Sequence, residues 1–138
     1  MPVHGGQLRM DTPGNGHIVD LTPGVERLIA TSEVDRGIVN VFATGSTVAV
    51  TTIEYEPGGV QDLQALLDRL VPAEAAYEHN RLNHDTNAHA HLRAALIGPS
   101  ETIPLVDGGL ALGTWQQLVL IDFDDRPRSR TVTVQVLS

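Results

Sequence analysis

The sequence predicts a single α+β domain over residues 1–138, with antiparallel β-sheets in a sandwich-like arrangement and two helices. The length of 138 residues suits one domain with a sizeable core. Most of the chain divides into short segments of alternating or β-branched residues, separated by Gly, Pro and Asn, which is typical of strands. Two segments have their apolar residues at helical spacing.

The first predicted elements are two strands and a helix. Residues 6–11 and 17–21 read as strands on either side of a Thr-Pro-Gly-Asn-Gly turn. The helix begins at Thr22, a favoured N-cap residue, and Pro23 fits its first position. Residues 37–43 are apolar on both faces, which is typical of a central strand.

The next segments predict further strands and the second helix. Residues 47–55 are rich in β-branched residues and are predicted to be the partner strand of residues 37–43. The second helix, residues 61–71, carries its apolar residues on one stripe and ends at Pro72. The remaining strands are predicted at residues 103–106, 110–113, 115–123 and 130–137.

Four of the six histidines lie in residues 77–93, and His89 and His91 form a His-Ala-His motif. In a strand the two side chains share a face, whereas in a helix they point to nearly opposite sides. Apolar and polar residues alternate from Ala88 to Leu96, which predicts a strand, although alanine is also a good helix former.

Two imidazoles on one face, with His79 as the expected third ligand, suit a three-histidine site for a divalent metal, zinc or magnesium. Nearby polar residues such as Tyr77 and Asn87 are suitable for orienting metal-bound imidazoles. His89 and His91 equally fit a polar strand face with two hydrogen-bonded histidines, and His-x-His alone is a common pattern.

Anion binding has two candidate segments. If the last strand begins near Arg128, then Arg128 and Arg130 share a face, and two guanidinium groups there suit a phosphate or carboxylate. The alternative is a solvated hairpin whose arginines pair with Asp124 and Asp125. The turn of residues 98–100, which ends at Ser100, fits an anion-binding nest or an ordinary turn.

Glu54 is the candidate general base. It lies at the end of a predicted strand, where a carboxylate near metal and anion groups suits proton transfer. Glu54 and Glu56 also precede the second helix, so a role at the helix N-terminus fits equally well.

Composition narrows the chemistry. The formal charge is −8 and all nine basic residues are arginines, so we expect no nucleic-acid partner, and Schiff-base chemistry on lysine is excluded. There is no cysteine, so any metal must bind His, Asp or Glu. No apolar run is long enough to span a membrane, and we expect a cytoplasmic protein.

One further pattern connects motifs from nearly the whole chain. It comprises residues 51–58, Tyr77-x-His79, Asn87-Ala88-His89-Ala90-His91-Leu92, Gly98-Pro99-Ser100, Pro104, Leu112-Gly113-Thr114-Trp115-Gln116, and Asp124 with Arg128 and Arg130. This pattern resembles the YjbQ-like secondary thiamine-phosphate synthase family. The Asn-x-His-x-His and Leu-Gly-Thr-Trp-Gln blocks are its most specific parts.

The resemblance implies an α+β fold, a homotrimer and a polar cleft around the histidines. It also implies weak synthesis of thiamine phosphate from hydroxymethylpyrimidine diphosphate and thiazole phosphate. One motif departs from the family, because Gly45-Ser46-Thr47 stands where many members carry His-Thr-Thr or His-Thr-Ser.

The expected function is therefore that of a small synthase-type enzyme with a phosphorylated substrate. Glu54, His79, His89 and His91 are its predicted catalytic residues, and Ser100, Arg128 and Arg130 its predicted phosphate-binding residues. Two alternatives stay open: metal-assisted hydrolysis at a three-histidine site, and a non-catalytic trimer that binds a small phosphorylated ligand.

Overall fold

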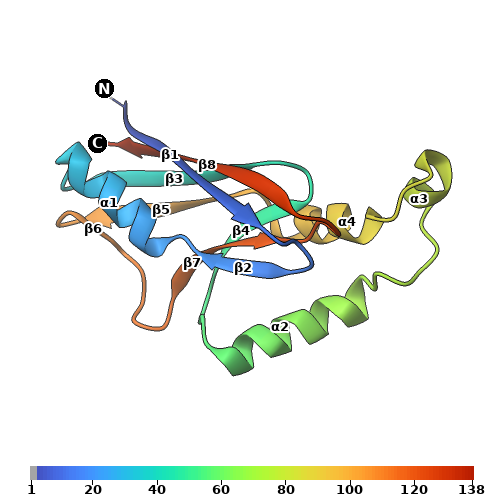
Figure 1. The fold of residues 1–138 in the computed structure, drawn as a ribbon. Coiled ribbons are helices and arrows are strands. Elements are labelled where there is room, and N and C mark those ends of the chain that lie inside the picture. The colour runs from blue at the N-terminus through green and yellow to red at the C-terminus, as the bar shows by residue number, and fades with distance from the viewer. Residues whose placement is uncertain (1–2) are drawn as a thin grey trace.

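The computed structural model describes residues 3–138 and contains two antiparallel sheets (Figure 1). Sheet A has the strand order β1 (Val3–Thr12), β8 (Arg128–Leu137), β3 (Gly37–Thr44), β5 (Ser100–Val106) and β6 (Gly109–Leu110). Sheet B has the order β2 (His17–Asp20), β7 (Gln117–Asp122) and β4 (Val48–Ile53). The helices of the described residues are α1 (Thr22–Ser32), α2 (Pro57–Leu70), α3 (Glu78–Asn83) and α4 (Ala88–Ile97). The predicted α+β class with antiparallel sheets is confirmed, with two more helices than predicted.

The main core lies between the two sheets. Alternate residues of sheet A point inward, including Val39 and Val41 of β3 and Val134 of β8, and none of these three has exposed surface. They belong to one cluster with Val50 of β4 and Val25 of α1. The central position predicted for residues 37–43 is confirmed, because β3 lies between β8 and β5.

Sheet B also buries its outer face, against the helices. Ala49 of β4 and Val119 of β7 form a second cluster with Ala90 and Ala94 of α4 and with Leu67 of α2. The fold therefore has three layers: sheet A, sheet B, and a layer containing α2 and α4. Figure 1 shows α3 beyond the end of the sheets, next to α4.

The predicted pairing of residues 47–55 with residues 37–43 is wrong. β4 belongs to sheet B, where Val48 lies opposite Asp122 and Ile53 lies opposite Gln117 of β7. The turn after β3 thus carries the chain from one sheet to the other. The β-branched residues identified a strand, but strand composition carries little information about which strand is its neighbour.

The strand predicted around His89 and His91 is also wrong, because residues 88–97 form helix α4. Ala90 and Ala94 are buried, whereas Leu92 and Leu96 are 46% and 65% exposed. Burial thus repeats every four residues, which is the helical period. Alanine is small enough to pack on any side of a helix, so the apparent alternation of two came from alanines and not from a buried strand face.

The strands nearest the C-terminus agree better with prediction. β5 and β8 confirm the strands at 103–106 and 130–137, and β8 starts at Arg128. The segment predicted at 115–123 is β7, which begins at Gln117 and leaves Trp115 74% exposed in the preceding loop. The strand predicted at 110–113 is reduced to the short β6.

No helix of residues 3–138 has the length and apolar character needed to cross a membrane.

Candidate functional site

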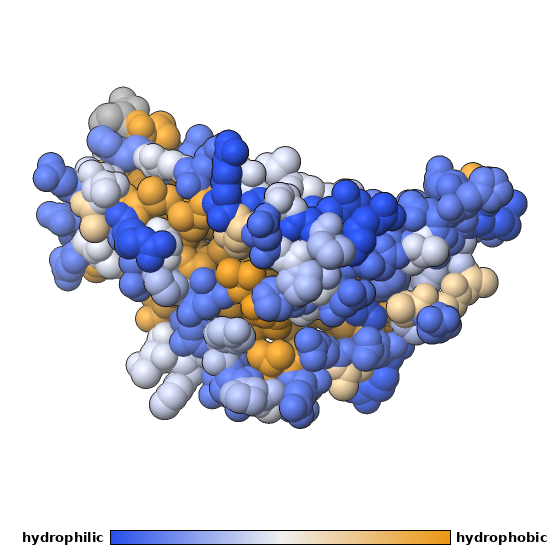
Figure 2. Space-filling view, viewed as in Figure 1, coloured by the Kyte–Doolittle hydropathy of each residue, from blue (hydrophilic) through white to orange (hydrophobic). Residues whose placement is uncertain are grey.

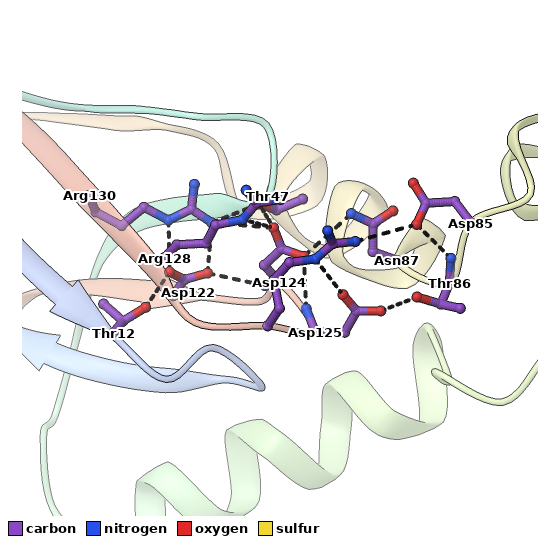
Figure 3. Close-up of polar contacts among 11 residues, drawn as sticks. Thr12, Thr47, Asp85, Thr86, Asn87, Asp122, Asp124, Asp125, Arg128 and Arg130 are labelled. Carbon is purple, nitrogen blue, oxygen red and sulfur yellow. Dashed lines mark hydrogen bonds and ion pairs between the residues drawn. The ribbon is translucent and has the colours of Figure 1, made fainter.

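A buried ion-pair network lies where β7 ends and β8 begins (Figure 3). Asp122 and Asp124 are 0% and 1% exposed. Arg130 donates hydrogen bonds from Nε to Asp122 Oδ2 at 2.7 Å and from Nη2 to Asp122 Oδ1 at 2.8 Å. Thr12 of β1 also donates to Asp122. This two-point contact fixes the plane of the Arg130 guanidinium group.

Asp124 is the second centre of the network. Its Oδ2 accepts hydrogen bonds from Arg128 Nε at 2.7 Å and from Thr47 Oγ1 at 3.1 Å, and its Oδ1 accepts one from Asn87 Nδ2 at 3.4 Å. Burial acts to raise the pKa of Asp124. The hydrogen bond from Arg128, followed by those from the Asp125 backbone, Asn87 and Thr47, outweighs burial and holds the pKa well below its usual range.

The pKa of Asp122 is lowered in the same way. Burial acts to raise it, but the hydrogen bonds from Arg130 and Thr12 and the Asp124 backbone, with the charge of Arg130, outweigh burial. Both carboxylates are therefore ionised at neutral pH, and the two arginines beside them keep their partners.

Arg128 and Arg130 share a face of β8, as the sequence predicted, but their surroundings differ. Arg130 is 8% exposed, and its Nη2 also donates to Thr47 at 2.7 Å, whereas its Nη1 forms no hydrogen bond with any residue from 3 to 138. The Arg128 side chain is 43% exposed and is held through Nε alone. The predicted alternative, pairing with Asp124, is thus present at Arg128, but Arg130 is buried and not part of a solvated hairpin.

The network continues toward the loop that precedes α4. Thr86 donates a hydrogen bond to Asp125, and Arg126 lies 3.7 Å from Asp85 and 3.6 Å from Asp125. These exposed contacts tie the hairpin before β8 to the segment that carries the histidines (Figure 3).

The helical conformation separates the histidines into two environments. His91 of α4 lies beside His79 of α3, with ring centroids 4.7 Å apart and ring planes tilted by 49°. His89 is 7% exposed, and its Nδ1 has no hydrogen-bond partner within the described part of the chain. Burial and the nearby charge of Arg93 lower the pKa of His89, so this imidazole is neutral at pH 7. The side chains that meet are therefore His79 and His91.

His91 lines a pocket of about 300 Å³ between α4 and the turn that joins β3 to β4. The other lining residues are Gly45, Ser46, Val48, Ala94, Ala95 and Pro99. Gly45 has a φ of +147°, and a Cβ at this position would lie 2.7 Å from Arg130 Nη1 and 3.0 Å from Val48 Cγ1. Glycine at position 45 thus lets the backbone approach the guanidinium group closely.

The three histidines do not fit a three-ligand metal site within one chain. Residues 3–138 contain no group of three or more His, Cys, Asp or Glu side chains placed to hold a metal ion. The physical reason is the helix, which turns His89 and His91 about 200° apart instead of onto one face. What the chain brings together is a pair of imidazoles.

Ser100 and Glu54 occupy different places relative to this pocket. Ser100 is the first residue of β5, next to the pocket residue Pro99. The turn before it does not offer successive free N–H groups, because Gly98 N donates to Ala94 O and proline has no N–H.

Glu54 lies after the last residue of β4, whereas Val48 at the start of β4 lines the pocket. By the rise of an extended strand, the two ends are about 20 Å apart. Glu56 is the N-cap residue of α2 and accepts hydrogen bonds from Gly58 N and Gly59 N. The helix-cap alternative therefore applies to Glu56, and Glu54 lies far from the histidine pocket of its own chain.

Sequence reasoning missed several members of the network, among them Thr12, Thr47 and Asp122. Asp122 ends β7 after four apolar residues, and Asp124 follows two positions later. Acidic residues at alternate positions at the end of a buried strand share one side and need partners, which was a usable signal. No local signal marked Thr47 as the partner of both Asp124 and Arg130.

Comparison with known proteins identifies relatives of the whole chain. The family model described as "UPF0047 protein YjbQ-like" matches residues 6–138. The chain belongs to this family. A UPF0047 protein of Methanothermobacter thermautotrophicus is 37% identical over 99% of this chain and 93% of its own length, and one of Archaeoglobus fulgidus is 39% identical over 95% and 99%.

Solved structures of YjbQ-like proteins have the same fold. A YbjQ-like protein of unknown function from Sulfolobus solfataricus superposes with a TM-score of 0.93 at 31% identity, over 99% of this chain and 98% of that one. A hypothetical protein from Aeropyrum pernix gives a TM-score of 0.90 at 34% identity, over 100% and 99%. The resemblance seen in the motifs is thus confirmed at the level of the family, and thiamine-phosphate synthase activity stays a prediction.

Proposed function

We propose that the pocket beside His91 binds a small phosphorylated molecule, and that this YjbQ-like protein is a weak enzyme of the thiamine-phosphate synthase type. One observation carries the proposal. Arg130 Nη1 lies without a hydrogen-bond partner from residues 3–138 close to Gly45, and Gly45 lines the same pocket as His91. A fixed guanidinium donor close to the pocket residue Gly45, together with the imidazole of His91, suits the oxygen atoms of a phosphate.

The electrostatic setting supports an anionic ligand in an acidic protein. Asp122 and Asp124 hold the two arginines in place without using all their donors. The Arg128 Nη groups form no hydrogen bond within the described residues, and this side chain is the more exposed of the two. Because the chain has no lysine, arginine, histidine and hydroxyl groups must supply the phosphate contacts.

The proposed reaction joins hydroxymethylpyrimidine diphosphate to thiazole phosphate and expels pyrophosphate. Its transition state has a cation-like pyrimidine and a departing diphosphate, so positioning and electrostatic stabilisation matter more than covalent help. Arg128 and Arg130 would stabilise the negative charge of the departing diphosphate. His91, supported by His79, would donate a proton or hydrogen bond to the leaving oxygen.

A direct test is formation of thiamine phosphate from the two substrates, measured by chromatography with mass detection. We expect His91→Ala to lower kcat/KM by about 100-fold, which is typical of losing a positioned acid–base group. His17→Ala is the matched control, since His17 is an exposed histidine of β2, and should leave the rate unchanged. Binding of thiamine phosphate without any turnover would instead favour a non-catalytic ligand-binding protein.

We propose that a divalent metal binds with only two protein ligands, His79 and His91. Two imidazoles are fewer than the three protein ligands of a typical catalytic zinc site. We therefore expect added zinc to bind weakly in a calorimetric titration, with binding lost in His91→Ala and kept in His89→Ala. Equal loss in both variants would contradict the separation of the two histidines.

Self-association as a homotrimer is supported by the outer face of sheet A. Ile38, Phe42 and Val106 are 43%, 42% and 46% exposed there, and uncharged Asn40 and Thr102 lie between them. Depletion of charge around exposed apolar residues is typical of protein interfaces. We expect sedimentation equilibrium to give three times the chain mass of 14.8 kDa, and Phe42→Glu to shift the protein toward the monomer. A monomer mass for the parent protein would exclude the trimer.

A further inference from the structure

A second cavity of about 200 Å³ lies between α2 and sheet B. His91 and Arg93 are two residues apart on α4, and they line different cavities, because a helix turns such residues to opposite sides. Ile18 of β2, Leu63 of α2 and Phe123 form an apolar part of the wall of this second cavity, and Asn15, Gln64 and Asp68 line the rest together with Arg93. Figure 2 shows hydrophobic residues at the surface where α2 faces the sheets.

Arg93 is the charged group of this cavity. It is 8% exposed, and its Nε and Nη2 donate to Val71 O at 3.1 and 2.8 Å. Nη2 also meets Asp68 Oδ1 at 3.0 Å, but the Asp68 side chain is 71% exposed. Nη1 forms no hydrogen bond with any described residue. This atom is not completely buried, so a small ligand can reach it.

Burial without a buried counter-ion is costly for a guanidinium group. An exposed carboxylate is screened by water and compensates weakly for the lost hydration of the buried cation. A ligand carboxylate in the cavity would accept from Nη1 and supply the missing negative charge. The geometry of Arg93 therefore favours an anionic ligand group beside the apolar wall residues Ile18, Leu63 and Phe123.

The volume limits the rest of the ligand. An apolar protein cavity of about 150 Å³ accommodates benzene, so 200 Å³ suits one ring with a small substituent. The α2 wall can adjust, because Leu67 is the one buried residue of that helix. Gln64 of α2 is bound to Gly16 O only at 3.5 Å, so its amide is available to a ligand.

We propose that this cavity is a binding site for small monocyclic carboxylates, separate from the phosphate pocket beside His91. The ring packs between Leu63, Phe123 and Ile18, and the carboxylate accepts a hydrogen bond from Arg93 Nη1. Binding ties α2 to sheet B and α4, and so adds contacts to a helix that has a single buried residue, Leu67.

Benzoate is the probe, titrated into the intact protein and followed by calorimetry or by NMR shifts of α2 amides. We expect saturable binding, at least tenfold weaker binding of neutral benzyl alcohol, and no displacement of benzoate by excess pyrophosphate. Leu63→Phe should fill the cavity and weaken benzoate binding at least tenfold. Leu66→Phe places the same ring on α2 at a residue that is 41% exposed, and should bind like the parent.

Arg93→Gln removes the charge and should abolish the preference for benzoate over benzyl alcohol. If this variant fails to fold, the two leucine variants still decide the outcome. The proposal is overturned if benzoate does not saturate, if pyrophosphate displaces it, or if Leu63→Phe and Leu66→Phe bind it equally.

Discussion

Replacing Arg130 with alanine is expected to lower the free energy of unfolding by about 3–5 kcal/mol, the cost of removing one partner from a buried ion pair. Asp122 has no exposed surface and receives two of its hydrogen bonds from Arg130. The alanine variant would leave this carboxylate charged and buried, with Thr12 and the Asp124 backbone as its remaining donors. Urea unfolding followed by circular dichroism measures the change.

The same prediction has a pH dependence. The pKa of Asp122 is lowered in the folded protein, so its stabilising contribution is present above the unfolded pKa of about 3.9 and is lost as pH falls through the lower folded value. We expect the parent protein to lose stability steeply below about pH 4. The Arg130→Ala variant should lose stability less steeply as pH falls, because the pKa of Asp122 is lowered less without Arg130.

Two controls separate the ion pair from general disturbance. Arg130→Lys should recover part of the stability, since an ammonium group can meet one carboxylate oxygen but cannot form the planar two-point contact. Arg69→Ala, in the last turn of α2 and exposed, should change stability by less than about 0.5 kcal/mol. If Arg130→Ala unfolds at the same urea concentration as the parent, the network does not stabilise this end of the sheets.

Arg128→Ala is expected to weaken binding of a phosphorylated ligand by about tenfold or more, without unfolding the protein. A guanidinium–phosphate contact is a charge-assisted hydrogen bond, and such contacts are the strong ones. The fold should survive because Asp124 keeps its hydrogen bonds from Thr47, Asn87 and the Asp125 backbone. Calorimetric titration with pyrophosphate and with thiamine phosphate reports the change.

Arg128→Lys should restore only part of the affinity, for the geometric reason that applies at Arg130. Arg69→Ala should bind within about twofold of the parent, because its position on α2 lies outside the network. If Arg128→Ala and the parent bind pyrophosphate equally, Arg128 serves only to neutralise Asp124.

Much of the architecture follows from local sequence. Three local patterns each correspond to an element of the fold: the alternation in residues 130–137, the apolar residues on both faces of residues 37–43, and the Thr22-Pro23 start of a helix. Each pattern depends only on neighbouring residues in the chain. The shared face of Arg128 and Arg130 is likewise a property of one strand.

Which distant segments pair or contact each other was decided by the tertiary structure. β4 joins β7 because its valines complete the core between the sheets while Ala49 packs against the helices, and no residue of β4 alone specifies that arrangement. The role of Thr47 depends on Asp124 and Arg130, which are 77 and 83 positions away in sequence. Glu54 illustrates the opposite case, since a plausible general base in sequence lies far from the histidines of its own chain.

The His-Ala-His motif shows most clearly where sequence stops and tertiary structure begins. Its residues predicted a candidate metal or phosphate site, in a chain that belongs to the YjbQ-like family. Whether His91 would be joined by His89 or by His79 depended on the choice between strand and helix. Packing of Ala90 and Ala94 against sheet B made that choice, because alanine tolerates both periods and only the buried surface distinguishes them.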